Sequence, residues 1–63
     1  MLAHQQRVVD EKYELDLKLS RLRDFINGKL CKSLSIEEQD RLNRQSDLMR
    51  AYSDVLEERI RAF

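Results

Sequence analysis

Residues that interrupt helices are almost missing from this sequence, and this feature constrains the fold more than any other. The chain of 63 residues has no Pro and a single Gly, Gly28. Because Pro and Gly most disfavour helix interiors, we expect long uninterrupted helices on both sides of Gly28. Turn signals occur only between Asn27 and Ser35. The sequence therefore predicts an all-α fold with one connection near its middle.

The boundaries of the two predicted helices follow from these signals. We expect one helix over residues 4–27, a loop over residues 28–35 and a second helix over residues 36–62. Ser35 and Glu38 match the S-x-x-E capping box, which marks a helix start. Two helices of similar length joined by a short loop favour an antiparallel hairpin, here a single domain over residues 1–63. Leu30 and Leu34 are placed to close the looped end.

The small size of the chain predicts self-association. A domain of about 60 residues buries only about 60% of its unfolded surface, so a monomer is marginally stable. A single Cys cannot form an internal disulfide, and one Cys with one His cannot build a four-ligand zinc site. We therefore expect the hairpin to assemble into a four-helix bundle or a higher homo-oligomer.

Apolar residues form more than one stripe along the predicted helices. Helix one carries a heptad seam with one polar interruption: Val8, Lys12, Leu15, Leu19, Leu22 and Ile26. Its second stripe, Val9, Tyr13 and Leu17, lies nearly opposite, so we predict it as an oligomer interface or a surface for a host protein. Helix two carries one stripe with Gln45 inside it: Leu42, Met49, Tyr52, Leu56, Ile60 and Phe63.

The sequence offers no catalytic or metal-binding constellation. His4 lies near the N-terminus without a second ligand, and Cys31 sits in the predicted loop without a base. Glu37 and Glu38 are consecutive on a helix and point about 100° apart, so they do not form an acid–base pair. We expect a protein that is not an enzyme and needs no cofactor or metal.

Three polar residues on the apolar stripes are the candidate ligand-binding residues. Arg59 and Tyr52 are seven residues apart on one side of helix two, where a guanidinium and an aromatic ring could hold an anionic, planar ligand such as a nucleotide. Lys12 interrupts the seam of helix one and could face the same ligand. The structural alternative is an arginine extending over a core tyrosine, with Lys12 fixing helix register.

Charge and hydropathy limit the other partners. The 12 basic and 12 acidic residues give a net charge of zero, which disfavours nucleic acid. Arg41, Arg44 and Arg50 still leave open a helical hairpin that binds nucleic acid in a Rop-like manner. No apolar stretch approaches the ~20 residues of a membrane span, so no membrane partner is expected.

Residues along nearly the whole chain carry a resemblance to a known family. They are His4-Gln5-Gln6-Arg7-Val8-Val9, Glu11-Lys12, Glu14-Leu15, Leu22, Phe25-Ile26, Leu34-Ser35, Glu37-Glu38-Gln39, Arg41-Leu42, Gln45, Met49, Tyr52-Ser53, Leu56 and Glu58-Arg59-Ile60. This combination resembles a family of small tailed-phage and prophage proteins related to an open reading frame of a crAss-like phage. The resemblance implies a phage accessory protein in the cytoplasm of its bacterial host.

The leading functional hypothesis combines the resemblance with the stripes. Small non-enzymatic phage proteins commonly act by binding, so we expect an oligomeric anti-defence protein that sequesters a cyclic-nucleotide immune signal or inhibits a host defence protein. The alternatives are the Rop-like hairpin and a structural or assembly factor of the virion. A helical hairpin accommodates all three.

Overall fold

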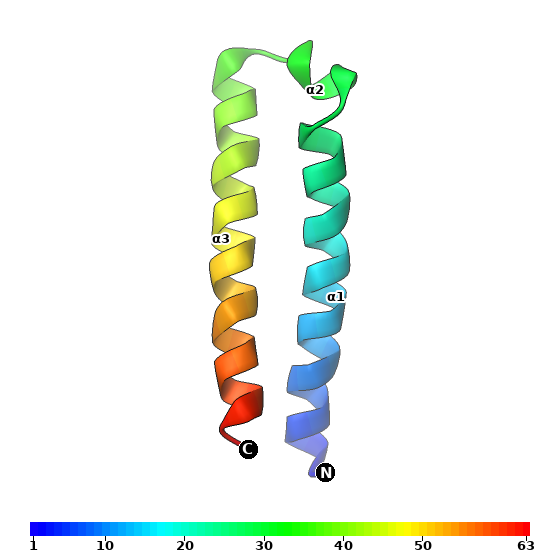
Figure 1. The fold of residues 1–63 in the computed structure, drawn as a ribbon, viewed down its shortest axis with the longest axis vertical. Helices are drawn as coiled ribbons and strands as arrows, with labels where there is room; N and C mark the ends of the chain where they lie inside the picture. The colour runs from blue at the N-terminus through cyan, green and yellow to red at the C-terminus, as the bar shows by residue number, and fades with distance from the viewer.

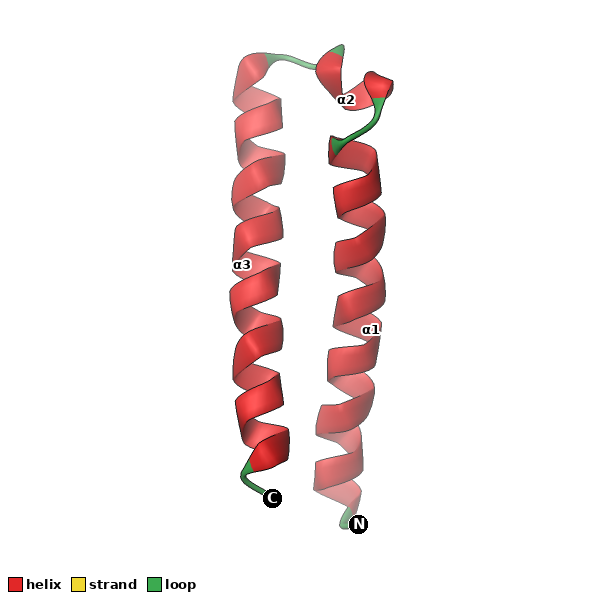
Figure 2. Ribbon diagram, viewed as in Figure 1, coloured by secondary structure: helices red, strands yellow, loops and turns green.

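The chain folds as a hairpin of two long helices in the structure, a computed structural model that describes residues 1–63 (Figures 1 and 2). Helix α1 spans Ala3–Ile26, the short helix α2 spans Lys29–Lys32, and helix α3 spans Ile36–Arg61. α1 and α3 run antiparallel side by side, and both termini lie at the end opposite α2. The molecule is a rod of 46 × 14 × 13 Å. The all-helical hairpin predicted from the sequence is confirmed.

Local side chains fix where the long helices begin. The Ser35 hydroxyl accepts a hydrogen bond from the Glu38 backbone N–H at 3.1 Å, as the capping-box pattern predicts. The Glu38 carboxylate does not return the bond; it accepts from Arg41 Nε at 2.8 Å. At the start of α1, the Gln5 side chain accepts a hydrogen bond from the Leu2 backbone N–H at 3.1 Å. Both helices begin within one residue of the predicted positions.

The connection is more ordered than the sequence indicated. Residues 28–35 were predicted as a loop, but Lys29–Lys32 form one helical turn that buries Cys31. Backbone hydrogen bonds close this turn: the Ser33 N–H donates to the Leu30 carbonyl at 3.2 Å and the Leu34 N–H donates to the Cys31 carbonyl at 3.0 Å. The exposed Ser33 hydroxyl also donates to the Leu30 carbonyl, at 2.6 Å. The prediction that Leu30 closes the looped end is wrong, because its side chain is mostly exposed and Cys31 fills that place.

The seam between α1 and α3 differs from prediction on one helix. On α1, Val8 and Leu19 are buried and Lys12 is half-buried, as the predicted heptad requires. On α3 the buried positions include Ser46 and Ser53, whereas Tyr52 and Phe63 are exposed. The α3 seam therefore follows a regular four- and three-residue spacing: Leu42, Ser46, Met49, Ser53, Leu56 and Ile60. The predicted seam passed through Tyr52 because tyrosine is apolar, and through Gln45 because of its spacing; each lies one residue before a buried serine.

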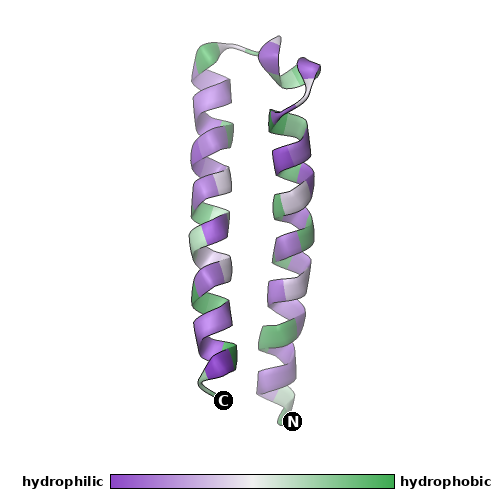
Figure 3. Cartoon of the chain, viewed as in Figure 1, coloured by the Kyte–Doolittle hydropathy of each residue, from purple (hydrophilic) through white to green (hydrophobic).

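The core of the hairpin is small. Four apolar residues are buried, Val8, Leu19, Cys31 and Leu56, and Leu56 alone has no exposed surface. Hydrophobic and hydrophilic segments alternate along both long helices, with no continuous apolar stretch (Figure 3). No helix combines the length and apolar character needed to span a membrane.

We expect Ser35→Ala to lower the free energy of unfolding by about 1 kcal/mol, because the Glu38 backbone N–H would lose its only side-chain acceptor. Chemical denaturation followed by circular dichroism would measure this change. Ser20→Ala is the matched control, because Ser20 is exposed in the interior of α1, where alanine favours the helix. Equal losses in the two variants would contradict a capping role for Ser35.

Candidate functional site

The predicted ligand residue Lys12 lies in a polar cluster between the helices. Its ammonium group donates hydrogen bonds to Asp16 Oδ2 at 2.8 Å and to Ser53 Oγ at 3.2 Å, and lies 4.0 Å from Glu57 Oε2. The Ser53 hydroxyl in turn donates to Asp16 Oδ1. We call these four residues, Lys12, Asp16, Ser53 and Glu57, the Lys12 cluster. It joins α1 to α3 through side chains from both.

The charges of the Lys12 cluster stabilise one another. The hydrogen bond to Asp16 raises the pKa of Lys12, with further contributions from the nearby carboxylates. Hydrogen bonds from Lys12 and Ser53 lower the pKa of Asp16. Both groups therefore stay ionised at neutral pH. Lys12 is therefore already paired with carboxylates in this structure and links α1 to α3; its predicted contact with a ligand stays a prediction.

Tyr52, the second predicted ligand residue, lies on a different flank of the hairpin. Tyr52 and Glu57 are five residues apart, which turns them about 140° apart around α3. Glu57 belongs to the Lys12 cluster, so the structure does not bring Lys12 and Tyr52 into one site. Arg59, the third predicted residue, is exposed two turns beyond Tyr52.

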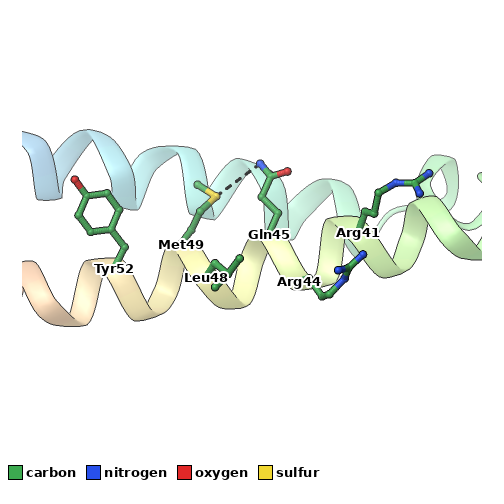
Figure 4. Close-up of a pocket in the computed structure, with 6 residues that line it drawn as sticks. All are labelled: Arg41, Arg44, Gln45, Leu48, Met49 and Tyr52. Atoms are coloured by element: carbon green, nitrogen blue, oxygen red, sulfur yellow. Dashed lines mark hydrogen bonds between the residues drawn. The ribbon is translucent and has the colours of Figure 1, made fainter.

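Tyr52 instead lines an open groove along α3 (Figure 4). The lining residues are Arg41, Arg44, Gln45, Leu48, Met49 and Tyr52, and we call this site the arginine–tyrosine groove. The two arginines lie at one end and Tyr52 at the other, with Leu48 and Met49 between them. The Gln45 amide contacts Met49 Sδ at 3.9 Å. Steps of three and one residues place all six on one face of the helix.

The arginines of the groove are held only by exposed ion pairs on their own helix. Arg41 Nε lies 2.8 Å from Glu38 Oε1, and Arg44 Nε lies 3.3 Å from Asp40 Oδ2. Exposed pairs of this kind contribute about 0–1 kcal/mol, so an anionic ligand can compete for the guanidinium groups. From Arg44 to Tyr52 the axial distance is about 12 Å at 1.5 Å per residue.

This groove combines three kinds of recognition. Guanidinium groups bind phosphate or carboxylate through paired hydrogen bonds, and a tyrosine ring provides a surface on which a planar group stacks. Leu48 and Met49 supply apolar surface between the two ends. Arg41 and Arg44 had been assigned from the sequence only to a nucleic-acid alternative. Steps of three or four residues lead from Arg41 and Arg44 to Tyr52 along the helix. This spacing could have shown from the sequence that the three side chains share one face.

Apolar side chains stay exposed on both long helices. On α1 the predicted interface lies on the surface, with Tyr13 66% exposed and Leu17 41% exposed. On α3 the exposed fractions are 71% for Leu48, 46% for Tyr52 and 50% for Val55. The oligomer interface at Val9, Tyr13 and Leu17 stays a prediction. No group of three or more His, Cys, Asp or Glu side chains is arranged to hold a metal ion.

Comparison with known proteins places the chain among phage proteins. An uncharacterized 7.5 kDa protein from the denB–rIIB intergenic region of Enterobacteria phage T4 is 38% identical over 63 residues, which cover all of this chain and 98% of that protein. The expected similarity to small phage proteins is confirmed, whereas the narrower relation to crAss-like phages stays a prediction. No solved structure matches the chain. A sequence model of the family described as Sequestin matches residues 2–62. The chain therefore belongs to the Sequestin family.

Proposed function

We propose that this protein is a phage accessory protein that acts by binding, and that it sequesters a small anionic, planar ligand in the arginine–tyrosine groove. The family description, Sequestin, supports a sequestering role, and the relative from phage T4 supports a phage protein. The observation that carries the proposal is the convergence of Arg41, Arg44 and Tyr52 on one open groove. The ligand class is a nucleotide immune signal of the bacterial host, encountered in its cytoplasm.

The groove needs no catalytic group for this function. Sequestration requires only that the ligand be held more tightly than by its host receptor, and the arginines and the tyrosine supply charge and stacking surface. Lys12 contributes indirectly, by fixing α1 against α3 through the Lys12 cluster. We therefore assign Tyr52 to the site, with Arg41 and Arg44 in place of Lys12.

A second candidate function is inhibition of a host defence protein through the exposed stripe of Val9, Tyr13 and Leu17. Its support is the exposure of Tyr13 and Leu17. The Rop-like alternative is less favoured, because Arg50 lies about 180° around α3 from Arg41. The three arginines of that hypothesis therefore do not form one patch.

We expect the double substitution Arg41→Gln and Arg44→Gln to weaken nucleotide binding at least about tenfold, since a hydrogen bond to a charged group contributes about 1.5–3 kcal/mol. Isothermal titration with ADP and with cyclic di-adenylate as probes would measure this loss. Native mass spectrometry of the protein purified from its bacterial host would identify a retained ligand.

Arg50→Gln is the matched control, because Arg50 is an exposed arginine of the same helix outside the groove. Its affinity for the probes should equal that of the unmodified protein. If neither probe binds and no nucleotide-sized adduct is retained, the proposed ligand class is wrong. Equal affinities for the double variant and the control would instead move the site away from this groove.

A further inference from the structure

We propose that two copies of this chain pair through their α3 helices about a two-fold axis, and that Arg59 of the partner subunit completes the arginine end of each arginine–tyrosine groove. This inference rests on the proposed function for the ligand, but the pairing itself rests on surface area and residue spacing. The occupant of the exposed α3 face is therefore a second copy of the same chain.

The exposed area of the hairpin matches the needs of a dimer. The chain exposes 5024 Å². A compact monomer of its mass, 7.6 kDa, is expected to expose about 4,300 Å². The excess of about 700 Å² is close to the roughly 800 Å² that each partner buries in a stable interface. One further contact of ordinary size would bring the hairpin to the burial of a compact protein.

The exposed residues of α3 repeat in a way that suits a helix–helix contact. Leu48, Tyr52 and Val55 are spaced by four and three residues, and all three are exposed. We call these residues the α3 stripe. Arg41 and Gln45 continue the same spacing toward one end of α3, and Arg59 continues it toward the other. The stripe therefore forms a second seam on the helix, apolar at its centre and basic at its ends.

A two-fold axis through the centre of the α3 stripe fixes which residues meet. An antiparallel pair of α3 helices centred between Leu48 and Val55 sets each Leu48 near Val55 of the partner subunit. The same register carries Arg59 of the partner subunit to the turn that holds Arg41 and Arg44. A shift of three residues in one direction sets it opposite Arg41 instead of Arg44. The pairing thus adds a third guanidinium to the groove. Tyr52 lies about 50° around α3 from the centre of the Leu48–Val55 contact, so its ring stays at the open edge of the pair.

The stripe on α1 is less suited to meeting a copy of itself. Val9 is partly buried, so the α1 stripe exposes only Tyr13 and Leu17, whereas all three residues of the α3 stripe are exposed. The α1 surface therefore suits a different partner, or a contact that extends a dimer into a larger assembly.

The third arginine defines the ligand more closely. Arg59 is exposed and forms none of the ion pairs found in the chain, so it is available to a ligand. Three guanidinium groups at one end favour a group with two or more negative charges, such as a pyrophosphate, over a single carboxylate. Because the site is complete only in the dimer, ligand binding and dimerisation must strengthen each other.

Sedimentation velocity over a range of concentrations tests the pairing. We expect the unmodified protein to dimerise, and the double substitution Leu48→Glu and Val55→Glu to give a helical monomer. The comparison variant, Val9→Glu with Tyr13→Glu, should keep the dimer. All four positions lie at or near the surface, so circular dichroism should show that each variant keeps its helices. Loss of the dimer only in the α1 variant, or no dimer in the unmodified protein, would overturn the inference.

Inorganic pyrophosphate tests the shared site. We expect it to tighten the dimer about tenfold, within the usual range of coupling between sites, and Arg59→Gln should keep the dimer but lose this effect. If Arg59→Gln responds to pyrophosphate like the unmodified protein, the partner's Arg59 is not part of the site. Nucleotide binding by a monomer would reject the pairing and leave the proposed function intact, whereas an α3 dimer that binds no nucleotide would do the reverse.

Discussion

Leu56→Ala should remove most of the free energy of unfolding of this protein. Leu56 is the only side chain with no exposed surface, and it lies in the seam between α3 and α1. Truncating a buried leucine costs about 3–5 kcal/mol, because the lost burial adds to the cavity that remains. Small domains have only about 5 kcal/mol of stability or somewhat more, so this single change removes most of it. Thermal unfolding followed by far-ultraviolet circular dichroism would measure the loss.

The matched control is Leu30→Ala, in which the same side chain is truncated at an exposed position in α2. Its melting temperature should stay close to that of the unmodified protein. Both variants must be compared at one protein concentration, because self-association adds stability that depends on concentration. A melting temperature for Leu56→Ala equal to that of the control would show that the seam is not the core of the fold.

The helical architecture could be predicted from the sequence because it depends on local signals. The absence of Pro, the single Gly28 and the cap at Ser35 each act within one turn of the chain. These signals placed α1 and α3 to within about one residue of their observed ends. The backbone of Gly28, just after α1, is extended, with φ of −88°. The end of the helix therefore does not use the left-handed conformation that glycine can adopt.

The seam of α3 could not be predicted in the same way, because it depends on contacts between helices. Ser46 and Ser53 are polar, so hydropathy assigned the neighbouring Tyr52 to the core, and the spacing from Tyr52 and Met49 to Leu42 then included Gln45. The structure buries Ser53 because its hydroxyl is satisfied by Lys12 and Asp16 of α1. A buried polar group is tolerated when its hydrogen bonds are made, and these partners are 37 and 41 residues away.

The displaced seam also explains the outcome for the candidate site. Once Ser46 and Ser53 face α1, Tyr52 turns toward the surface and joins Arg41 and Arg44 along the same face. Lys12 was correctly placed in the seam, but its carboxylate partners could not be chosen from the many acids of the sequence. Spacing along one helix could have joined Tyr52 to Arg41 and Arg44, whereas the pairing of Lys12 with Asp16 and Ser53 needed the structure.

Lys12→Met should lower the free energy of unfolding by about 1–2 kcal/mol at pH 7. This loss lies between the contribution of an exposed ion pair and the larger loss that follows when a buried ion pair is broken. The methionine keeps the aliphatic part of the side chain but leaves Asp16 without its cation, whereas Glu57 keeps its ion pair with Arg61. Lys18→Met is the matched control, because Lys18 is exposed on the same helix and forms none of the ion pairs found in the chain. Urea unfolding of both variants would measure the difference.

The pH dependence of this loss identifies its cause. The folded-state pKa of Asp16 lies below its ordinary value of 3.8, so the stability from this group is present above pH 3.8 and is lost as the pH falls through the lowered pKa. The pKa of Lys12 is raised above 10.5, so its contribution is lost only as the pH rises beyond that value. The difference between Lys12→Met and the unmodified protein should therefore be largest between about pH 4 and 10 and shrink at pH 2. A difference that stayed constant from pH 7 to pH 2 would mean that Lys12 stabilises the seam through packing rather than charge.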